Sequence, residues 1–161
     1  MANSNSTPRI KPRLLRDALG NFATGVTVVT YDNNGVPAGI TVSSFTSVSL
    51  DPALVLVNLH KNSKAAERLD GKPFTINVLS NDQLPIAMQF AGGDQEDVTV
   101  DWDNFGIAPR FAQAHAYYTC RPWATYDGGD HIILVGEVVD YHSDTESDPL
   151  VFHQSRFKEI R

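Results

Sequence analysis

The sequence predicts a mainly β protein, an antiparallel barrel with a few peripheral helices. Most apolar segments are short, β-branched or aromatic, and bounded by turn residues. Only a few residues join most of them, whereas a parallel, doubly wound sheet needs a long crossover after nearly every strand. The 161 residues fit one domain and are too few for a dinucleotide-binding half plus a separate catalytic half.

Composition limits the classes of function. Hydrophobic residues make up 42% and charged residues 20%, so a packed core is expected and global disorder is excluded. The formal net charge of -6 at pH 7 argues against nucleic acid and anionic membrane surfaces as partners. The only cysteine, Cys120, cannot form an intramolecular disulfide, and the first nine residues show no secretory signal pattern, so we expect a cytoplasmic protein.

The N-terminal part is predicted to be a flexible segment followed by a helix. Residues 1–10 are rich in Asn and Ser, and we expect a single domain over residues 11–161. Between residues 12 and 22, apolar side chains recur at helical spacing, which predicts an amphipathic helix of about three turns. Its apolar face consists of Leu14, Leu15, Ala18, Leu19 and Phe22.

A β-hairpin is predicted next. Residues 26–31 and 36–42 have extended patterns, and residues 32–35 accept the left-handed backbone angles of a tight turn. Further strands are expected at residues 45–50, 53–59, 74–79, 116–126 and 131–141, and short helices at residues 63–69 and 83–90. A solvated loop, favoured over a strand by charge repulsion, is expected around Asp94, Glu96, Asp97, Asp101 and Asp103.

Residues 41–49 carry six hydroxyl side chains, interleaved with Val42, Phe45 and Val48. Composition alone favours an edge strand with a hydroxyl face. The alternative is a binding segment, because small side chains let a flat ligand approach the backbone. Backbone N–H groups and hydroxyls then hydrogen-bond ring carbonyls while the apolar neighbours pack behind.

The segment that follows is basic, in an acidic protein. A predicted strand ends near His60, Ser63 is a helix-capping residue type, and Lys61, Lys64 and Arg68 are close by in the sequence. A helix start with a hydroxyl and an ammonium binds phosphate well. An ordinary helix cap with solvated lysines explains the same residues equally well.

A histidine begins a predicted buried strand. The turn at residues 127–130 contains two glycines and delivers His131 to the first position of that strand. A histidine there is more often a packed or capping residue than a catalytic one. Walker, Rossmann, H-E-x-x-H and paired C-x-x-C motifs are absent, and we expect no metal site. Together, the hydroxyl segment, the basic turn and His131 suggest a site for a flat, phosphorylated cofactor.

Four motifs, in order along the chain, carry a resemblance to a known family. They are FATGVTVVT at residues 22–30, GITVSSFTSVSLDP at residues 39–52, FTINVL at residues 74–79 and GDHIILVGEV at residues 129–138. With them, nearly the full length of the chain resembles the short-chain flavin reductases. The resemblance implies an antiparallel, flavin-binding split β-barrel, and often a reductase component of a two-component flavin-dependent monooxygenase.

The resemblance also implies roles for individual residues. The flavin ring would contact Thr41, Val42, Ser43 and Ser44, with Asn58 and Phe90 beside the ring and ribityl chain. The flavin phosphate would be bound by Lys61, Ser63 and Lys64. The NAD(P)H side would be formed by Gly129, Asp130, His131 and Phe157, with His131 positioning the nicotinamide.

The implied enzyme is an oxidoreductase that transfers a hydride from NADH or NADPH to FMN or FAD. The protein would orient the two rings, and fixed N–H donors of residues 41–44 would stabilise the negative charge that develops on the flavin. A homodimer and a flavin-dependent monooxygenase partner are expected with it. Two alternatives stay open: a non-enzymatic flavin-binding or storage protein of the same fold, and a barrel that carries apolar ligands.

Overall fold

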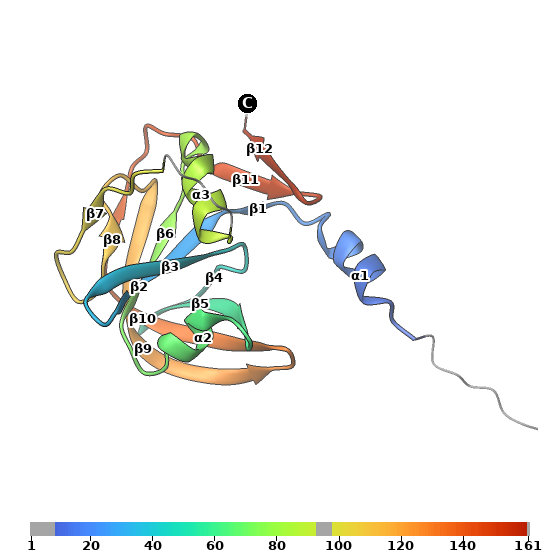
Figure 1. Ribbon diagram of the computed structural model, residues 1–161, viewed down its shortest axis with the longest axis horizontal. Helices are drawn as coiled ribbons and strands as arrows, with labels where there is room; N and C mark the ends of the chain where they lie inside the picture. Colours follow the sequence, from blue (N-terminus) through green and yellow to red (C-terminus); the bar gives the residue numbers. More distant parts are fainter. Residues whose placement is uncertain (1–8, 93–97, 161) are drawn as a thin grey trace, which may run out of the picture.

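Antiparallel strands dominate the structure (Figure 1). The computed structural model describes residues 9–92 and 98–160. Residues 1–8 of the predicted flexible segment, and the acidic residues Asp94, Glu96 and Asp97, lie outside the described residues.

The main element is a seven-stranded sheet. In order across the sheet, its strands are β3 (Val36–Val42), β2 (Thr27–Asn33), β6 (Phe74–Val78), β9 (Ala116–Gly128), β10 (His131–Ser143), β5 (Ala53–His60) and β4 (Thr46–Leu50). The sheet coils, so that β3 and β5 contact each other although the strand order separates them (Figure 1). The predicted antiparallel barrel is therefore confirmed, in the split form that the resemblance implies.

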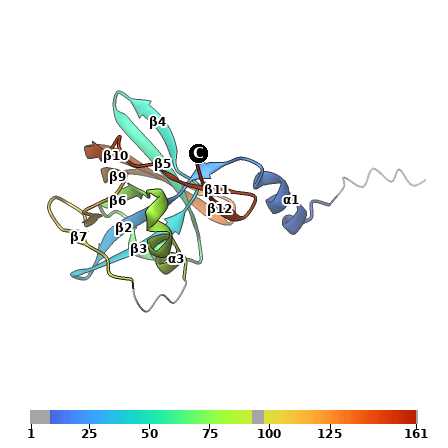
Figure 2. The ribbon, with the colours of Figure 1, turned by 90° about the horizontal axis from the view of Figure 1, so that it is seen from above.

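The described part of the chain adds two smaller sheets and four helical segments to this barrel. One sheet contains β1 (Thr24–Gly25), β11 (Leu150–His153) and β12 (Arg156–Glu159), and the other contains β7 (Trp102–Asp103) and β8 (Arg110–Phe111). The helical segments are α1 (Pro12–Leu19), α2 (Lys64–Arg68), the 3-10 turn η1 (Asn81–Gln83) and α3 (Leu84–Phe90). Helix α3 packs on β3, whereas α1 projects away from the barrel in both views (Figures 1 and 2). Within residues 9–92 and 98–160, every helix is too short or too polar to cross a bilayer.

The predicted hairpin is confirmed. Strands β2 and β3 pair from Thr27↔Val42 to Asn33↔Val36. Asn34 and Gly35 form the two-residue turn with φ of 53° and 88°, the left-handed geometry that such a turn requires. The other five predicted strands are also present, and the last two are longer than expected, forming the β9–β10 hairpin that closes at Gly129.

Some sequence expectations need correction. Helix α1 ends at Leu19 rather than Phe22, with Gly20 at its C-cap. A loop was expected around the acidic residues, but Asp103 lies in strand β7. Arg110 on the paired strand neutralises the Asp103 carboxylate at a distance of 3.1 Å. Strands β11 and β12 were not predicted, since their turn places Gln154 and Ser155, rather than glycine, at positive φ.

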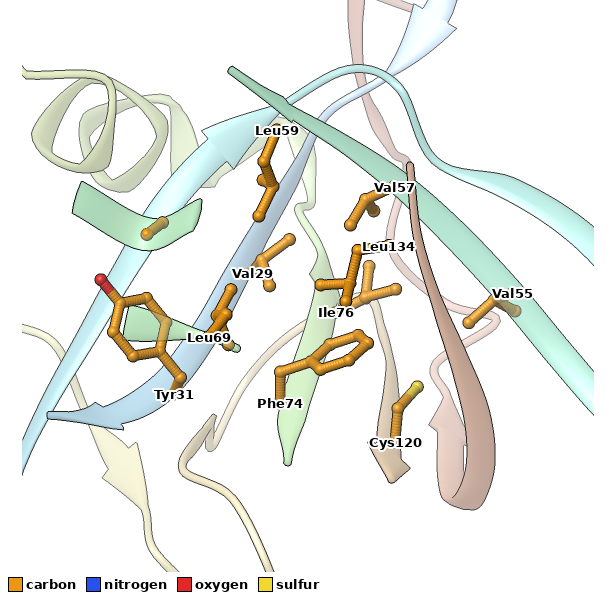
Figure 3. Packing of buried hydrophobic residues seen from close by; sticks show 11 residues of the cluster. Val29, Tyr31, Val55, Val57, Leu59, Leu69, Phe74, Ile76, Cys120 and Leu134 are labelled. Carbon is orange, nitrogen blue, oxygen red and sulfur yellow. The ribbon is translucent and has the colours of Figure 1, made fainter. Parts of the chain in front are cut away.

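Two hydrophobic clusters stabilise the barrel. Figure 3 shows the larger one, in which Phe74 and Ile76 of β6 pack against residues from β2, β5 and β10. Gly136 of β10 leaves the space that the Phe74 ring and Cys120 fill, since a Cβ there would lie 2.6 Å and 2.7 Å from their nearest atoms. The smaller cluster includes Val28 of β2 and Ala87 of α3, and it fixes α3 on the barrel beside the end of β3.

A buried asparagine joins the β7–β8 region to the barrel. Asn77 of β6 donates to the carbonyl of Val28 at 2.9 Å and to the hydroxyl of Thr30 at 3.0 Å. Its Oδ1 accepts from the backbone N–H of Phe111 at 2.9 Å. All of these groups are buried, so the network satisfies polar atoms that would otherwise be costly.

Candidate functional site

A small cavity lies against the predicted ring-binding segment. Its volume is about 180 Å³. Apolar side chains and two hydroxyl residues line it: Val26, Thr41, Val42, Ser43, Ala91, Phe152 and Phe157. The fold thus brings Phe157, predicted on the NAD(P)H side, to three residues predicted to contact the flavin ring. The Phe157 ring packs on Phe152 with a centroid distance of 5.1 Å.

Hydrogen bonds fix the end of β3 beside this cavity. The hydroxyl of Thr27 donates to the carbonyl of Val42 at 3.0 Å. The hydroxyl of Thr41 donates to the carbonyl of Ala87 in α3 at 2.7 Å. Because its proton is used in that bond, Thr41 can only accept a hydrogen bond from a ligand, through the lone pairs of its hydroxyl oxygen. The segment is therefore held in place before any ligand arrives.

Ser44 connects this segment to β5. Its hydroxyl accepts from the backbone N–H of Asn58 at 2.9 Å and donates to the Asn58 carbonyl at 3.1 Å. The side-chain Oδ1 of Asn58 is buried and has no hydrogen-bond partner within the described part of the chain. An unsatisfied buried oxygen is costly, and such atoms gather at sites that bind a polar ligand.

A larger cavity, of about 740 Å³, lies on the other side of Ser43. It extends along β1 toward the first residues of β9 and the end of β10. Its lining residues include Thr24, Ser43, Phe45, His115 and Tyr118. The rings of Phe45 and Tyr118 stack at 5.4 Å, and the Thr24 hydroxyl is buried with no partner among the residues described. Ser43 therefore borders both cavities.

A histidine pair lies where β5 ends and β10 begins. The strand register places His131 opposite His60, and their rings meet edge to face at 5.2 Å. Nδ1 of His131 lies 2.6 Å from Oδ1 of Asp130, and this hydrogen bond lowers the pKa of the Asp130 carboxyl. A carboxylate can only accept, so Nδ1 is the donor and Nε2 is the ring nitrogen left to face a ligand.

The basic turn is bound to the glycine turn. Nζ of Lys61 lies 2.5 Å from Oδ1 of Asp127, and the Lys61 backbone N–H donates to the Asp130 carbonyl at 3.0 Å. The hydrogen bond from Lys61 and its charge lower the pKa of the Asp127 carboxyl. The predicted phosphate-binding and nicotinamide-binding residues are therefore neighbours in space.

The other predicted site residues lie in different parts of the structure. Ser63 accepts from the N–H of Ala66 at 3.1 Å, so the capping interpretation of Ser63 is confirmed, and Lys64 is exposed at the start of α2. Gly129 has a φ of +79°, which favours glycine there. The Phe90 ring packs against Trp102 at 6.0 Å and Phe111 at 5.7 Å, and its neighbour Ala91 lines the small cavity.

The residues around the small cavity and those around the histidine pair form a continuous strip. Asn58, which is bonded to Ser44, lies two residues before His60 in the same strand. The strip offers apolar walls and hydroxyls at one end, and Lys61 with an imidazole at the other. This donor set fits a flat conjugated ligand with ring carbonyls and an anionic group, as a flavin has. Among residues 9–92 and 98–160, no cluster of His, Cys, Asp or Glu is arranged to hold a metal ion.

Fold and site together define a ligand-binding split barrel. Comparison with known proteins is more specific: residues 19–161 match the flavin reductase like domain, and the chain belongs to this family. It is 43% identical over 147 residues to the reductase component of a 4-nitrophenol 4-monooxygenase/4-nitrocatechol 2-monooxygenase from Rhodococcus opacus, covering 88% of this chain and 77% of that protein.

A further relative and a solved structure support the same family. Over 147 residues, the chain is 41% identical to the FMN reductase (NADH) SmoA of Agrobacterium fabrum, covering 90% of this chain and 84% of that protein. The solved structure of the flavin reductase PheA2 in its native state superposes with a TM-score of 0.89 and 38% identity, covering 94% of this chain and 99% of that one. The resemblance stated from the motifs is confirmed.

Sequence reasoning missed four residues of the strip. His60 could have been found from strand alternation, which places it on the same face of β5 as Asn58. Asp127 gave no signal, because its partner Lys61 is distant in sequence. Phe152 lies in a strand that was not predicted, and Ala91 lines the cavity only through the docking of α3.

Proposed function

We propose that this protein is an NAD(P)H-dependent flavin reductase, an oxidoreductase that transfers a hydride from the nicotinamide to FMN or FAD. Family membership and the names of its relatives support this activity. The structural observation that carries the proposal is the Ser44–Asn58 connection. It joins a rigid hydroxyl segment beside an apolar cavity to the strand that ends at the histidine pair.

Thr41, Val42, Ser43 and Ser44 hold the flavin ring in this proposal. Val42 supplies an apolar contact, and Ser43 borders both cavities. The buried Oδ1 of Asn58, without a partner among the residues that the structure describes, supports a polar contact beside the ring. Phe90, whose ring packs on Trp102 and Phe111, would lie beside the flavin ring and the ribityl chain.

Lys61, Ser63 and Lys64 bind the flavin phosphate. Lys61 and Lys64 are exposed cations beside the strip, in a chain whose overall charge is negative. The Ser63 hydroxyl accepts from Ala66 and keeps its own proton to donate to a phosphate oxygen. An anion bound here would meet two positively charged side chains and one hydroxyl donor within a single turn of the chain.

His131 positions the nicotinamide, with Gly129, Asp130 and Phe157 completing the NAD(P)H side. Asp130 fixes the orientation of the His131 ring through Nδ1, which presents Nε2 to the carboxamide. Gly129 leaves the turn without a side chain, so a ligand can approach the backbone. Phe157 offers an apolar ring at the wall of the small cavity.

The bound flavin supplies a ring that accepts the hydride, so no side-chain nucleophile is needed. What the protein supplies is orientation and charge stabilisation. Backbone N–H groups of residues 41–44 would donate to the ring carbonyls, where negative charge develops during reduction. The anchoring of Thr41 on α3 and of Ser44 on β5 keeps these donors in position.

A monooxygenase that consumes the reduced flavin is the proposed partner, as in the Rhodococcus opacus relative, which is named a reductase component. A homodimer is proposed as well. The apolar face of α1 supports it, since Leu14, Leu15 and Leu19 are 61%, 46% and 65% exposed. The cytoplasm, where reduced pyridine nucleotides are available, is the proposed compartment, and the buried free thiol of Cys120 is compatible with it.

A steady-state assay tests the proposal. NADH and NADPH oxidation is followed with no flavin, with FMN and with FAD added to the purified protein. Oxidation that depends on flavin and scales with protein concentration is expected. Flavin binding without turnover would instead support the storage protein, and neither binding nor turnover would support the apolar-ligand carrier.

A further inference from the structure

Lys61, one of the two cations proposed to bind the flavin phosphate, is already paired with a carboxylate. Nζ of Lys61 lies 2.5 Å from Oδ1 of Asp127, an exposed carboxylate on the β9–β10 hairpin. Figure 1 shows this hairpin beside β5, whose end leads to Lys61. The Lys61 backbone N–H is bonded to the carbonyl of Asp130 in the same turn, at 3.0 Å. Both the backbone and the side chain of Lys61 are therefore held by the glycine turn.

We propose that Asp127 is a selectivity residue that opposes the binding of anions at Lys61, so that the site selects flavins by their ring more than by their phosphate. The inference rests on the proposed function, because it takes Lys61 as a phosphate ligand.

The charges give the direction of this effect. A phosphate that docks on the Lys61 ammonium must displace the Asp127 carboxylate or share the ammonium with it. Sharing places two negative groups on one cation, and like charges at such separations repel. Riboflavin carries the same ring without a phosphate, so Asp127 leaves its binding unaffected. FMN carries a dianion and experiences the full effect.

The size of the effect follows from exposure. The side chains of Lys61 and Asp127 are 44% and 79% exposed, so water and salt screen the pair. Exposed ion pairs of this kind change an affinity by about two- to fivefold. The difference between FMN and riboflavin should also decrease as the salt concentration rises.

Flavin binding, followed by quenching of flavin fluorescence, tests the proposal directly. Asp127→Asn is compared with the wild type for FMN and for riboflavin. We expect FMN to bind about two- to fivefold more tightly and riboflavin to be unchanged. Asp127→Glu, which keeps the charge, should restore the wild-type ratio of the two affinities. In a Lys61→Met background, Asp127→Asn should tighten FMN binding less than it does when Lys61 is present.

Asp70→Asn is the matched control, because it removes an exposed carboxylate just beyond α2 and leaves Lys61 paired. If Asp70→Asn tightens FMN binding as much as Asp127→Asn does, the effect is one of overall charge and the proposal is wrong. Equal changes for FMN and riboflavin, or weaker FMN binding, also contradict it. If no added flavin supports NADH oxidation by the wild type, the proposed reductase activity is rejected. The FMN and riboflavin titrations would still decide the role of Asp127. Binding of neither flavin would reject both.

Discussion

Ser44 and Asn58 exchange two hydrogen bonds between the β3–β4 connection and β5. The Ser44 hydroxyl accepts from the Asn58 N–H at 2.9 Å and donates to the Asn58 carbonyl at 3.1 Å. One small side chain thereby joins the chain to β5 just before β4 begins to pair with β5 at Thr46↔Leu56. The connection fixes the distance between the proposed ring-binding segment and the strand that leads to His60.

Ser44→Ala should weaken flavin binding through the ring. Loss of this connection costs about 1 kcal/mol per hydrogen bond and leaves the Asn58 backbone groups without their partner. We expect the Kd values of riboflavin and FMN to rise by the same factor, roughly fivefold or more. Fluorescence titration of both flavins measures this.

Ser47→Ala provides the control, since Ser47 is an exposed hydroxyl residue on β4 in the same serine-rich segment. It should leave both affinities unchanged. An Ser44→Ala variant that weakens FMN but not riboflavin would contradict the assignment of this segment to the ring.

His131→Ala should separate nicotinamide binding from flavin binding. Removal of the imidazole takes away Nε2, while the Lys61–Asp130 backbone bond still holds the turn. We expect the KM for NAD(P)H to rise, by roughly tenfold for one lost charge-assisted or well-placed hydrogen bond, with flavin Kd changed much less. Steady-state kinetics at saturating flavin give the first quantity and fluorescence titration gives the second. His142→Ala, at the far end of β10, is the control, and unchanged NAD(P)H kinetics in His131→Ala would remove the role of His131.

Gly136→Ala should destabilise the barrel. The added Cβ would lie 2.6 Å from Cζ of Phe74 and 2.7 Å from Cβ of Cys120, both of which are buried. Overpacking of this kind costs about 1 to 3 kcal/mol of unfolding free energy. Denaturant unfolding measures the change. At Gly25 an added Cβ meets nothing within 4 Å, so Gly25→Ala should change the unfolding free energy much less. Equal effects of the two substitutions would contradict the packing described here.

Asp103 should contribute to stability in a pH-dependent way. Its carboxylate accepts from the Phe105 N–H at 2.8 Å and from Arg110 at 3.1 Å, and these contacts lower its pKa below the ordinary 3.8. Because the pKa of Asp103 is lower in the native than in the unfolded state, its ionised carboxylate stabilises the fold above pH 3.8. This contribution is lost as pH falls through the native pKa.

Asp103→Asn should therefore lower the unfolding free energy at neutral pH by less than about 1 kcal/mol, because the pair is partly exposed. The difference from the wild type should disappear on acidification below pH 3.8. Urea unfolding at several pH values measures it, with exposed Asp101→Asn as the control. A difference that persists at low pH would show that the Asp103 charge is not its cause.

Local sequence signals predicted the parts of the fold that local chemistry determines. Asn34 and Gly35 specify a two-residue turn, and the β-branched segments around it specify the strands. The two-residue strand β1 had no such signal, because it exists only through its partner β11 in a distant segment. Strand β7 pairs with the nearby β8, but each of these strands has only two residues, too few for a strand pattern. The turn at Gln154 and Ser155 was missed because non-glycine residues occupy positive φ there.

The site was predictable only in part, for the same reason. The hydroxyl segment at residues 41–44 and the basic turn are continuous in sequence, so their chemistry is visible in the chain. Contacts that join these segments to other parts of the site, such as Ser44 with Asn58 and Lys61 with Asp127, depend on the strand order and the register. The approach of Phe157 to Thr41 likewise required strands that the pattern did not indicate.

The central claim is that the barrel brings a reduced nicotinamide and a flavin together for hydride transfer. Anaerobic mixing of the purified protein with FMN and NADH, followed by the visible absorbance of the flavin, tests it most directly. The account predicts loss of that absorbance at a rate proportional to protein concentration, with NADH oxidised in equal amount. If the absorbance persists with both FMN and FAD, and with both NADH and NADPH, the account is contradicted.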